Sequence, residues 1–325
     1  MNKRLLSFLL LLQALSATAQ TLPTATSQHP ADSAAGQSDT ILHTASGNIY
    51  GTLSIPDTKQ KIPVVLIIAG SGPVDRNGNV FGMESNVYRL LADSLFQHGI
   101  ASLRYDKRGI GQSAAAMRSE SELTIGDMIG DAAGWISLLK TDPRFSRVIV
   151  LGHSEGSLIG MVAAKTANAD AYISVSGAGD RIDKIIETQL RARAPQLSEK
   201  ATLLLDSLSK GYKVREPGGS LNGLFRLSVQ PYMISWIRYD PQEEIKKLKI
   251  PILILQGVTD IQVSVEDARA LKEAQPAATL VLIEGMNHVL KPAPADPQQN
   301  IATYNAPKLS LKPELVSAID AFILR

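Results

Sequence analysis

The nine residues from Val148 to Gly156 constrain the fold of this chain more than any other stretch. They begin with four apolar residues typical of a buried strand and continue directly into Gly-His-Ser-Glu-Gly, which fits the pattern G-x-S-x-G. A stretch with helical character follows, from Leu158 to about Lys165. A strand and a helix joined by this pattern predict a turn so sharp that Ser154 has strained backbone geometry and exposes its hydroxyl above a sheet. The flanking glycines give such a turn the room that it needs.

Predicted strands and helices alternate along most of the chain. Apolar runs predict strands at residues 62–69, 100–104, 148–151, 171–175, 250–256 and 279–283. Helical spacing predicts helices at residues 84–98, 124–139, 158–165, 265–275 and 313–324. Two further short strands, at residues 41–45 and 49–56, surround Gly47-Asn48 and resemble a hairpin. The alternation predicts an α/β fold, in which helices cover both faces of a mostly parallel sheet.

The alternation stops between about residues 180 and 247, where helical segments replace the expected strands. We interpret this stretch as a helical cap inserted over the carboxyl edge of the sheet. Its second half is rich in aromatic residues. Four of its side chains are candidates for lining a substrate pocket beneath the cap: Phe225, Tyr232, Met233 and Trp236. Packing in a hydrophobic core is the alternative explanation for the same four residues.

The first 40 residues are predicted to lie outside the folded domain, which then spans residues 41–325. Two basic residues, the apolar run 5–12 and the small residues 17–19 fit a secretory signal peptide over residues 1–19. An uncleaved anchor is the alternative, although the apolar run is short for a membrane-spanning helix. Residues 20–40 are polar, lack periodicity and are predicted to form a disordered tether. We therefore expect an exported protein, periplasmic or secreted, whose mature form is not stably inserted in a membrane.

The charge and the cysteine content narrow the function further. The 325 residues include 33 Lys and Arg against 31 Asp and Glu, and removal of Lys3 and Arg4 with the signal peptide leaves 31 of each sign. A neutral chain gives no electrostatic reason to expect a nucleic acid as partner. The absence of Cys excludes disulfides, thiol catalysis and cysteine-bound zinc.

A serine hydroxyl at neutral pH needs a base within hydrogen-bond reach before it can attack a carbonyl. The chain has five histidines as candidates: His29, His43, His98, His153 and His288. His288 follows the last predicted strand, and in a parallel sheet that loop opens at the same edge as the turn at Ser154. His153 is next to the serine, and its side chain is expected to point away from it. We therefore predict His288 as the base, with a surface loop histidine as the alternative.

Such a base needs an acid that fixes its tautomer and stabilises its charged form. Asp260 follows the predicted strand 250–256, again at the carboxyl edge, and we predict it as this acid. Glu266 and Asp267 are also near, but acids favour the first turn of a helix for electrostatic reasons alone. The chain order Ser154, Asp260, His288 fits a triad on an α/β sheet.

An oxyanion needs two preorganised N–H donors. The backbone of Glu155, directly after the serine, is predicted to supply one. Ser71, between two glycines in the loop after the strand 62–69, is predicted to supply the other, a plain glycine-rich turn being the alternative. Asp106 and Arg108 resemble a catalytic pair, but we interpret them as a local ion pair that braces the loops below the site.

These motifs together resemble the α/β-hydrolase superfamily, over roughly residues 41–325. They are similar to its serine aminopeptidase-like (S33-type) branch of hydrolases and esterases, which includes many exported bacterial proteins. The resemblance is carried by Gly70-Ser71-Gly72-Pro73, Asp75-Arg76-Asn77-Gly78, Asp106-x-Arg108-Gly109-x-Gly111-x-Ser113, Gly152-His153-Ser154-Glu155-Gly156, Gly257-x-x-Asp260 and Gly285-Met286-Asn287-His288. The resemblance implies the same triad and the same oxyanion donors that we predict above from the residues alone. It is more specific for the fold than for the substrate.

The sequence thus predicts a serine hydrolase that cleaves carboxylic esters with short to medium acyl chains and needs neither metal nor cofactor. Its expected partner is a small-molecule ester. One alternative is an aminopeptidase acting on small peptides, which would need an acidic group in the cap to bind the substrate amine. The other is a ligand-binding protein that keeps the fold without turnover.

Overall fold

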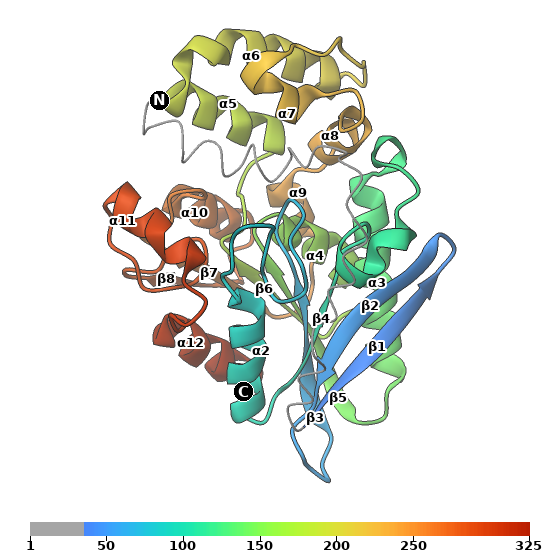
Figure 1. Cartoon of the computed structure of the whole chain (residues 1–325). Helices are drawn as coiled ribbons and strands as arrows, with labels where there is room; N and C mark the ends of the chain where they lie inside the picture. The colour runs from blue at the N-terminus through green and yellow to red at the C-terminus, as the bar shows by residue number, and fades with distance from the viewer. Residues whose placement is uncertain (1–35) are drawn as a thin grey trace.

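The structure is a computed structural model that describes residues 36–325 (Figure 1). Its sheet has eight strands in the order β1-β2-β4-β3-β5-β6-β7-β8. The pairs β1–β2 and β2–β4 are antiparallel, and the remaining pairs are parallel. The strands are β1 Gln37–Thr44, β2 Gly47–Ser54, β3 Ile62–Ile68, β4 Ala101–Tyr105, β5 Phe145–His153, β6 Ala171–Val175, β7 Ile252–Gly257 and β8 Thr279–Ile283.

Helices cover both faces of this sheet, as the alternation predicts. Those that follow or connect the strands are α2 Val87–Gln97, α3 Ile125–Thr141, α4 Glu155–Thr166, α9 Pro241–Lys246, α10 Val265–Ala274, α11 Pro297–Ala302 and α12 Pro313–Ile323. Short 3₁₀ helices occur at η2 Gly111–Ala116, η3 Glu120–Glu122, η4 Gly219–Leu221 and η5 Thr303–Asn305. One core contains buried residues of α3, α4 and α10, and a second core on the other face contains those of α2 and α12. The predicted α/β class and its mostly parallel sheet are confirmed.

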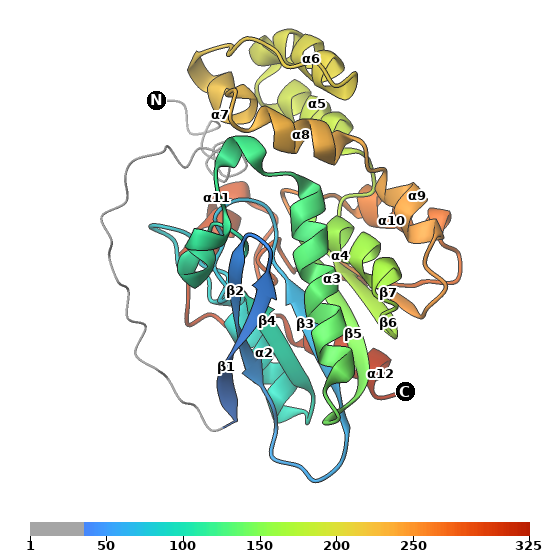
Figure 2. The ribbon, with the colours of Figure 1, turned by 90° about the vertical axis from the view of Figure 1, so that its right-hand side faces the viewer.

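Four helices occupy the interruption between β6 and β7: α5 Ile182–Arg193, α6 Pro195–Ser209, α7 Asn222–Phe225 and α8 Gln230–Ile237. They lie together at one end of the α/β body (Figures 1 and 2), and we call them the helical insertion. The next helix, α9, packs against α4 and α10 and so belongs to the body. None of the helices in residues 36–325 is both long and apolar enough to cross a membrane.

The boundary of the predicted tether is wrong at its last four residues. Residues 37–40 are the first half of β1, where Gln37 pairs with Ser54 and Thr40 with Gly51. The prediction failed because β1 is an edge strand, held by backbone hydrogen bonds to β2 while none of its side chains is fully buried. The predicted signal peptide and the remainder of the tether lie outside the described residues.

Candidate active site

The turn after β5 has the geometry that its sequence predicts. Ser154 lies between β5 and α4 with φ 56° and ψ −122°, a backbone conformation that residues other than glycine rarely adopt. A Cβ atom on Gly152 would lie 2.1 Å from the Gly156 carbonyl oxygen, and one on Gly156 would lie 2.3 Å from that of Ile68. Both positions therefore require glycine, which lets the turn pack tightly on itself and on β3. The Ser154 side chain remains half-buried at the carboxyl edge of the sheet.

Asp260 and His288 come together in the loops after β7 and β8. The His288 Nδ1 atom lies 2.8 Å from the Asp260 Oδ2 atom, and both side chains are buried. The other carboxylate oxygen of Asp260 accepts hydrogen bonds from the backbone N–H groups of Gln262 and Val263, at 2.8 and 3.1 Å. Burial acts to raise the pKa of Asp260, but the His288 ring and these two donors outweigh it and hold that pKa below the usual value. Asp260 is thus placed as an ionised acceptor for the Nδ1–H group.

The serine is not part of this hydrogen-bonded pair. Among residues 36–325, the Ser154 hydroxyl has no hydrogen-bond partner, and His288 is hydrogen bonded to Asp260 through its ring. The His288 backbone does reach the turn, because its carbonyl accepts a hydrogen bond from His153 Nε2 at 2.8 Å. Hydrogen bonds between nucleophile and base are often long in enzymes without substrate and tighten when substrate binds.

His153 links the loops on both sides of the serine, a role that the sequence did not reveal. Its Nε2 atom must carry the proton, since its partner, the His288 carbonyl, only accepts. Its Nδ1 atom then accepts from the Tyr88 hydroxyl at 2.8 Å, and that hydroxyl accepts from the Gly70 N–H group at 3.0 Å. Burial and the neighbouring His288 lower the pKa of His153 to about 3, so the ring is neutral at physiological pH.

The buried His153 ring predicts a specific loss of stability in acid. Between pH 6.5 and 3 the unfolded chain binds a proton at this residue that the folded chain does not, so the free energy of unfolding falls as the pH falls. This contribution is about 1.4 kcal/mol per pH unit. We expect urea unfolding to show that, between pH 6.5 and 4.5, the free energy of unfolding falls less steeply for His153→Gln than for the wild type.

His43→Gln is the matched control for this experiment, because His43 is exposed on β1. Its unfolding curves should have the pH dependence of the wild type. A His153→Gln variant whose stability falls in parallel with that of the wild type would contradict a neutral, buried His153.

Both predicted oxyanion donors are beside the serine. Ser71 and Glu155 line the same pocket as Ser154. The oxyanion loop, which we define as residues 70–73, approaches the turn so closely that a Cβ atom on Gly70 would lie 3.0 Å from the Ser154 Cβ atom. The Glu155 side chain is buried, and its Oε1 atom accepts a hydrogen bond from the Tyr232 hydroxyl at 2.8 Å.

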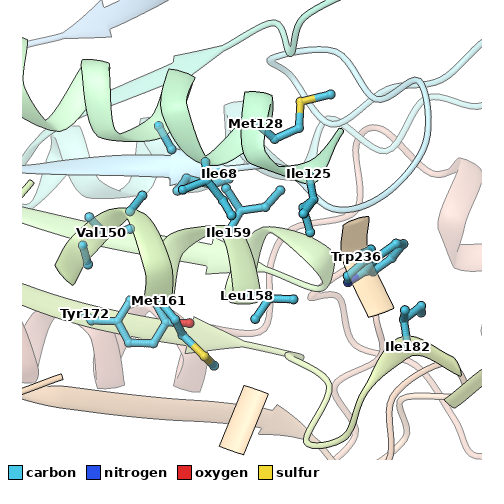
Figure 3. Packing of buried hydrophobic residues seen from close by; sticks show 14 of the residues in the cluster. Ile68, Ile125, Met128, Val150, Leu158, Ile159, Met161, Tyr172, Ile182 and Trp236 are labelled. Carbon is cyan, nitrogen blue, oxygen red and sulfur yellow. The ribbon is translucent and has the colours of Figure 1, made fainter. Parts of the chain in front are cut away.

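The pocket beside Ser154 has a volume of about 50 Å³ and lies between the carboxyl edge of the sheet and the helical insertion. Its lining includes the apolar side chains of Leu158, Ile182 and Trp236, which Figure 3 shows near one another where α4 faces α5 and α8. Asp180 and Gln189 are among its polar lining residues.

Only one of the four predicted pocket residues is found in this lining. Trp236 is there, whereas the Tyr232 hydroxyl is bound to Glu155. Phe225 and Met233 are fully buried in the hydrophobic core that includes the insertion, so their assignment to the pocket is wrong. The prediction failed because helical spacing alone does not distinguish side chains that face the core from those that face the site.

Asp106 and Arg108 do not form the predicted ion pair with each other. Asp106 binds Arg76, whose Nη2 atom lies 2.8 Å from Oδ2, and Arg108 binds Asp131 at 2.6 Å. Asp106 also accepts a hydrogen bond from the Arg76 backbone N–H group at 2.9 Å. These pairs brace the loops that follow β3 and β4. Residues 36–325 contain no cluster of three or more His, Asp or Glu side chains suited to a metal ion.

A model of the family described as serine aminopeptidase, S33, matches residues 80–291 of this chain. Esterase EstD of Thermotoga maritima is 27% identical over 254 residues, which cover 74% of this chain and 57% of EstD. The chain therefore spans little more than half the length of this curated relative.

Two solved structures show the same fold. Est1E of Butyrivibrio proteoclasticus, solved with ferulic acid, is 16% identical with a TM-score of 0.55, and the match covers 88% of this chain and 99% of Est1E. The α/β hydrolase GrgF of Penicillium sp. sh18 is 19% identical with a TM-score of 0.54, and the match covers 89% of this chain and 99% of GrgF. At these identities the likeness shows the α/β-hydrolase fold.

Proposed function

This chain belongs to the serine aminopeptidase, S33, family, and from that premise we propose that it hydrolyses carboxylic esters with Ser154 as nucleophile. The observation that carries the proposal is the strained turn at Ser154, placed at the same sheet edge as the bonded Asp260–His288 pair. Backbone strain of this kind clusters at functional sites, and the half-buried Ser154 hydroxyl has no hydrogen-bond partner among residues 36–325 that a substrate would have to displace. The relative named as an esterase supports the ester class of substrate.

In the proposed reaction, the Ser154 oxygen attacks the ester carbonyl while His288 Nε2 takes the hydroxyl proton. Asp260 keeps the other ring proton on Nδ1 and stabilises the imidazolium. His288 then gives its proton to the leaving alcohol as the carbon–oxygen bond of the ester breaks. A water molecule, deprotonated by the same base, releases the acyl group from Ser154 as a carboxylic acid.

The negative charge that develops on the carbonyl oxygen is stabilised by the backbone N–H groups of Ser71 and Glu155. Glu155 is the first residue of α4, whose first N–H groups have no partner within the helix. The positive end of the helix dipole favours the oxyanion as well.

The pocket beside Ser154 suits a short acyl chain. One water molecule needs about 10–15 Å³ of cavity volume, so a pocket of about 50 Å³ has room for roughly four groups of the size of a water or a methylene. Acyl groups of two to four carbons are therefore the proposed substrates, and Trp236 is the large side chain that limits the chain length.

Replacing Trp236 with alanine is expected to move the preference toward longer acyl chains. Each additional buried methylene contributes about 0.8 kcal/mol, so the ratio of kcat/KM for octanoate over acetate should rise at least about tenfold. Met233→Leu changes a neighbour in α8 that is fully buried in the core, and it should leave the ratio unchanged. An unchanged chain-length profile in Trp236→Ala would show that the acyl group binds elsewhere.

The class of substrate is tested by hydrolysis of p-nitrophenyl esters from acetyl to palmitoyl, measured beside aminoacyl-p-nitroanilides. We expect turnover of the short esters that is absent in Ser154→Ala. Turnover of the anilides alone would assign the site to a peptidase, with Asp180 in the pocket lining as the first residue to examine for amine binding. A folded protein inactive on both series would favour a binding protein.

A further inference from the structure

A buried lysine lies directly behind the proposed oxyanion site. Lys107 follows β4 and is only 4% exposed. Its ammonium group donates a hydrogen bond to the Gly70 carbonyl oxygen at 2.5 Å, and its nitrogen lies 3.9 Å from the Glu155 Oε2 atom. The reaction described above gives this lysine no role.

The Gly70 carbonyl and the Ser71 N–H group are the two ends of one peptide unit. Because the peptide is trans and planar, they point in opposite directions, and an anchor on the carbonyl fixes where the N–H group points. A cation on the carbonyl also polarises the amide, which makes its N–H group a stronger donor. Lys107 therefore both orients and strengthens the group that we assign to the oxyanion.

The second oxyanion donor is connected to the same lysine. Glu155 supplies its backbone N–H group to the site and its carboxylate to Lys107, and the Tyr232 hydroxyl of α8 holds that carboxylate from the helical insertion. Burial lowers the pKa of Lys107 and raises that of Glu155, and the opposite charge of each partner counteracts the shift of the other. Such a buried pair is a weak source of stability compared with apolar side chains of the same size. Stability alone therefore does not account for the pair.

We propose that Lys107 is a positioning residue, which orients and polarises the Gly70–Ser71 peptide as an oxyanion donor and is balanced by Glu155. This inference rests on the proposed function, since it concerns the same serine. It extends that function by linking both oxyanion donors, through one charge pair, to the helical insertion.

The test is the rate at which a fluorophosphonate probe labels Ser154. In this reaction the serine oxygen bonds to phosphorus and gives its proton to His288, fluoride leaves, and the phosphoryl oxygen occupies the oxyanion site. We expect Lys107→Met to label about 10²-fold more slowly than the wild type, the usual effect of losing an oxyanion donor. Lys165→Met makes the same change at an exposed position of α4 and should label at the wild-type rate.

A rescue experiment separates positioning from a merely structural role. The chain has no Cys, so a Lys107→Cys variant can be alkylated at that single site with 2-bromoethylamine in denaturant and then refolded. The product carries an ammonium group at nearly the length of lysine, and its labelling rate should recover at least tenfold over Lys107→Met. Wild-type protein taken through the same procedure is the control.

If Lys107→Met alone does not fold, the double variant Lys107→Met/Glu155→Gln removes both charges of the pair. The labelling rate of this double variant then tests the inference in place of the single variant. Wild-type labelling of any folded variant that lacks the ammonium group would overturn the inference. Ester turnover is measured in the same samples as a separate result. A wild type that labels rapidly at Ser154 but hydrolyses no ester would contradict the proposed function alone.

Discussion

Replacing Ser154 with alanine should lower ester turnover by on the order of 10⁴-fold or more while the protein remains folded. Turnover requires the serine oxygen, whereas stability does not, because that oxygen has no hydrogen-bond partner among residues 36–325. A Cβ atom on Gly70 would come closest to the Ser154 Cβ atom, and alanine keeps this atom. We therefore expect the free energy of unfolding to change by no more than about 0.5 kcal/mol.

The measurement is kcat/KM with p-nitrophenyl acetate, together with urea unfolding of each variant. Ser137→Ala, at an exposed position of α3, is the matched control and should retain full activity. Residual turnover in Ser154→Ala above about one hundredth of the wild-type value would move the nucleophile to another residue.

Replacing Asp260 with asparagine should reduce kcat/KM by a similar factor, on the order of 10⁴-fold. The backbone donors of Gln262 and Val263 require an oxygen at the position of Oδ1, so the new amide nitrogen must face His288. That nitrogen donates to Nδ1 and leaves the ring proton on Nε2, where the base must be free to accept. His288 is then held in the tautomer that does not deprotonate the serine.

Asp206→Asn makes the same substitution on the exposed side of α6 and should keep wild-type kcat/KM. The two variants are compared at neutral pH with p-nitrophenyl acetate. A loss of less than tenfold in Asp260→Asn would mean that another group sets the tautomer of the base.

Local sequence patterns predicted the elements of the fold well. The apolar run before the G-x-S-x-G pattern is the centre of β5, and the helix predicted at residues 124–139 is α3, which Thr124 caps through a reciprocal pair of hydrogen bonds with Asp127. These features succeed because each depends on neighbours within a few residues. The start of β1 was missed because edge strands depend on backbone pairing more than on apolar side chains.

The surroundings of the site depend on contacts between distant parts of the chain, which a single sequence does not reveal. Tyr88 is 65 residues from His153, and Tyr232 is 77 residues from Glu155. Lys107 was part of a recognised motif, yet only the folded structure places it behind the Gly70–Ser71 peptide.

The central claim, that Ser154 carries the acyl group, is tested most directly by rapid mixing with p-nitrophenyl acetate followed by acid quenching. We predict a burst of about one equivalent of p-nitrophenol per protein chain, and an acetylated peptide that contains Ser154 in the mass spectrum of the quenched digest. A burst whose acetyl group maps to another residue, or turnover without any acyl-enzyme at Ser154, would contradict it.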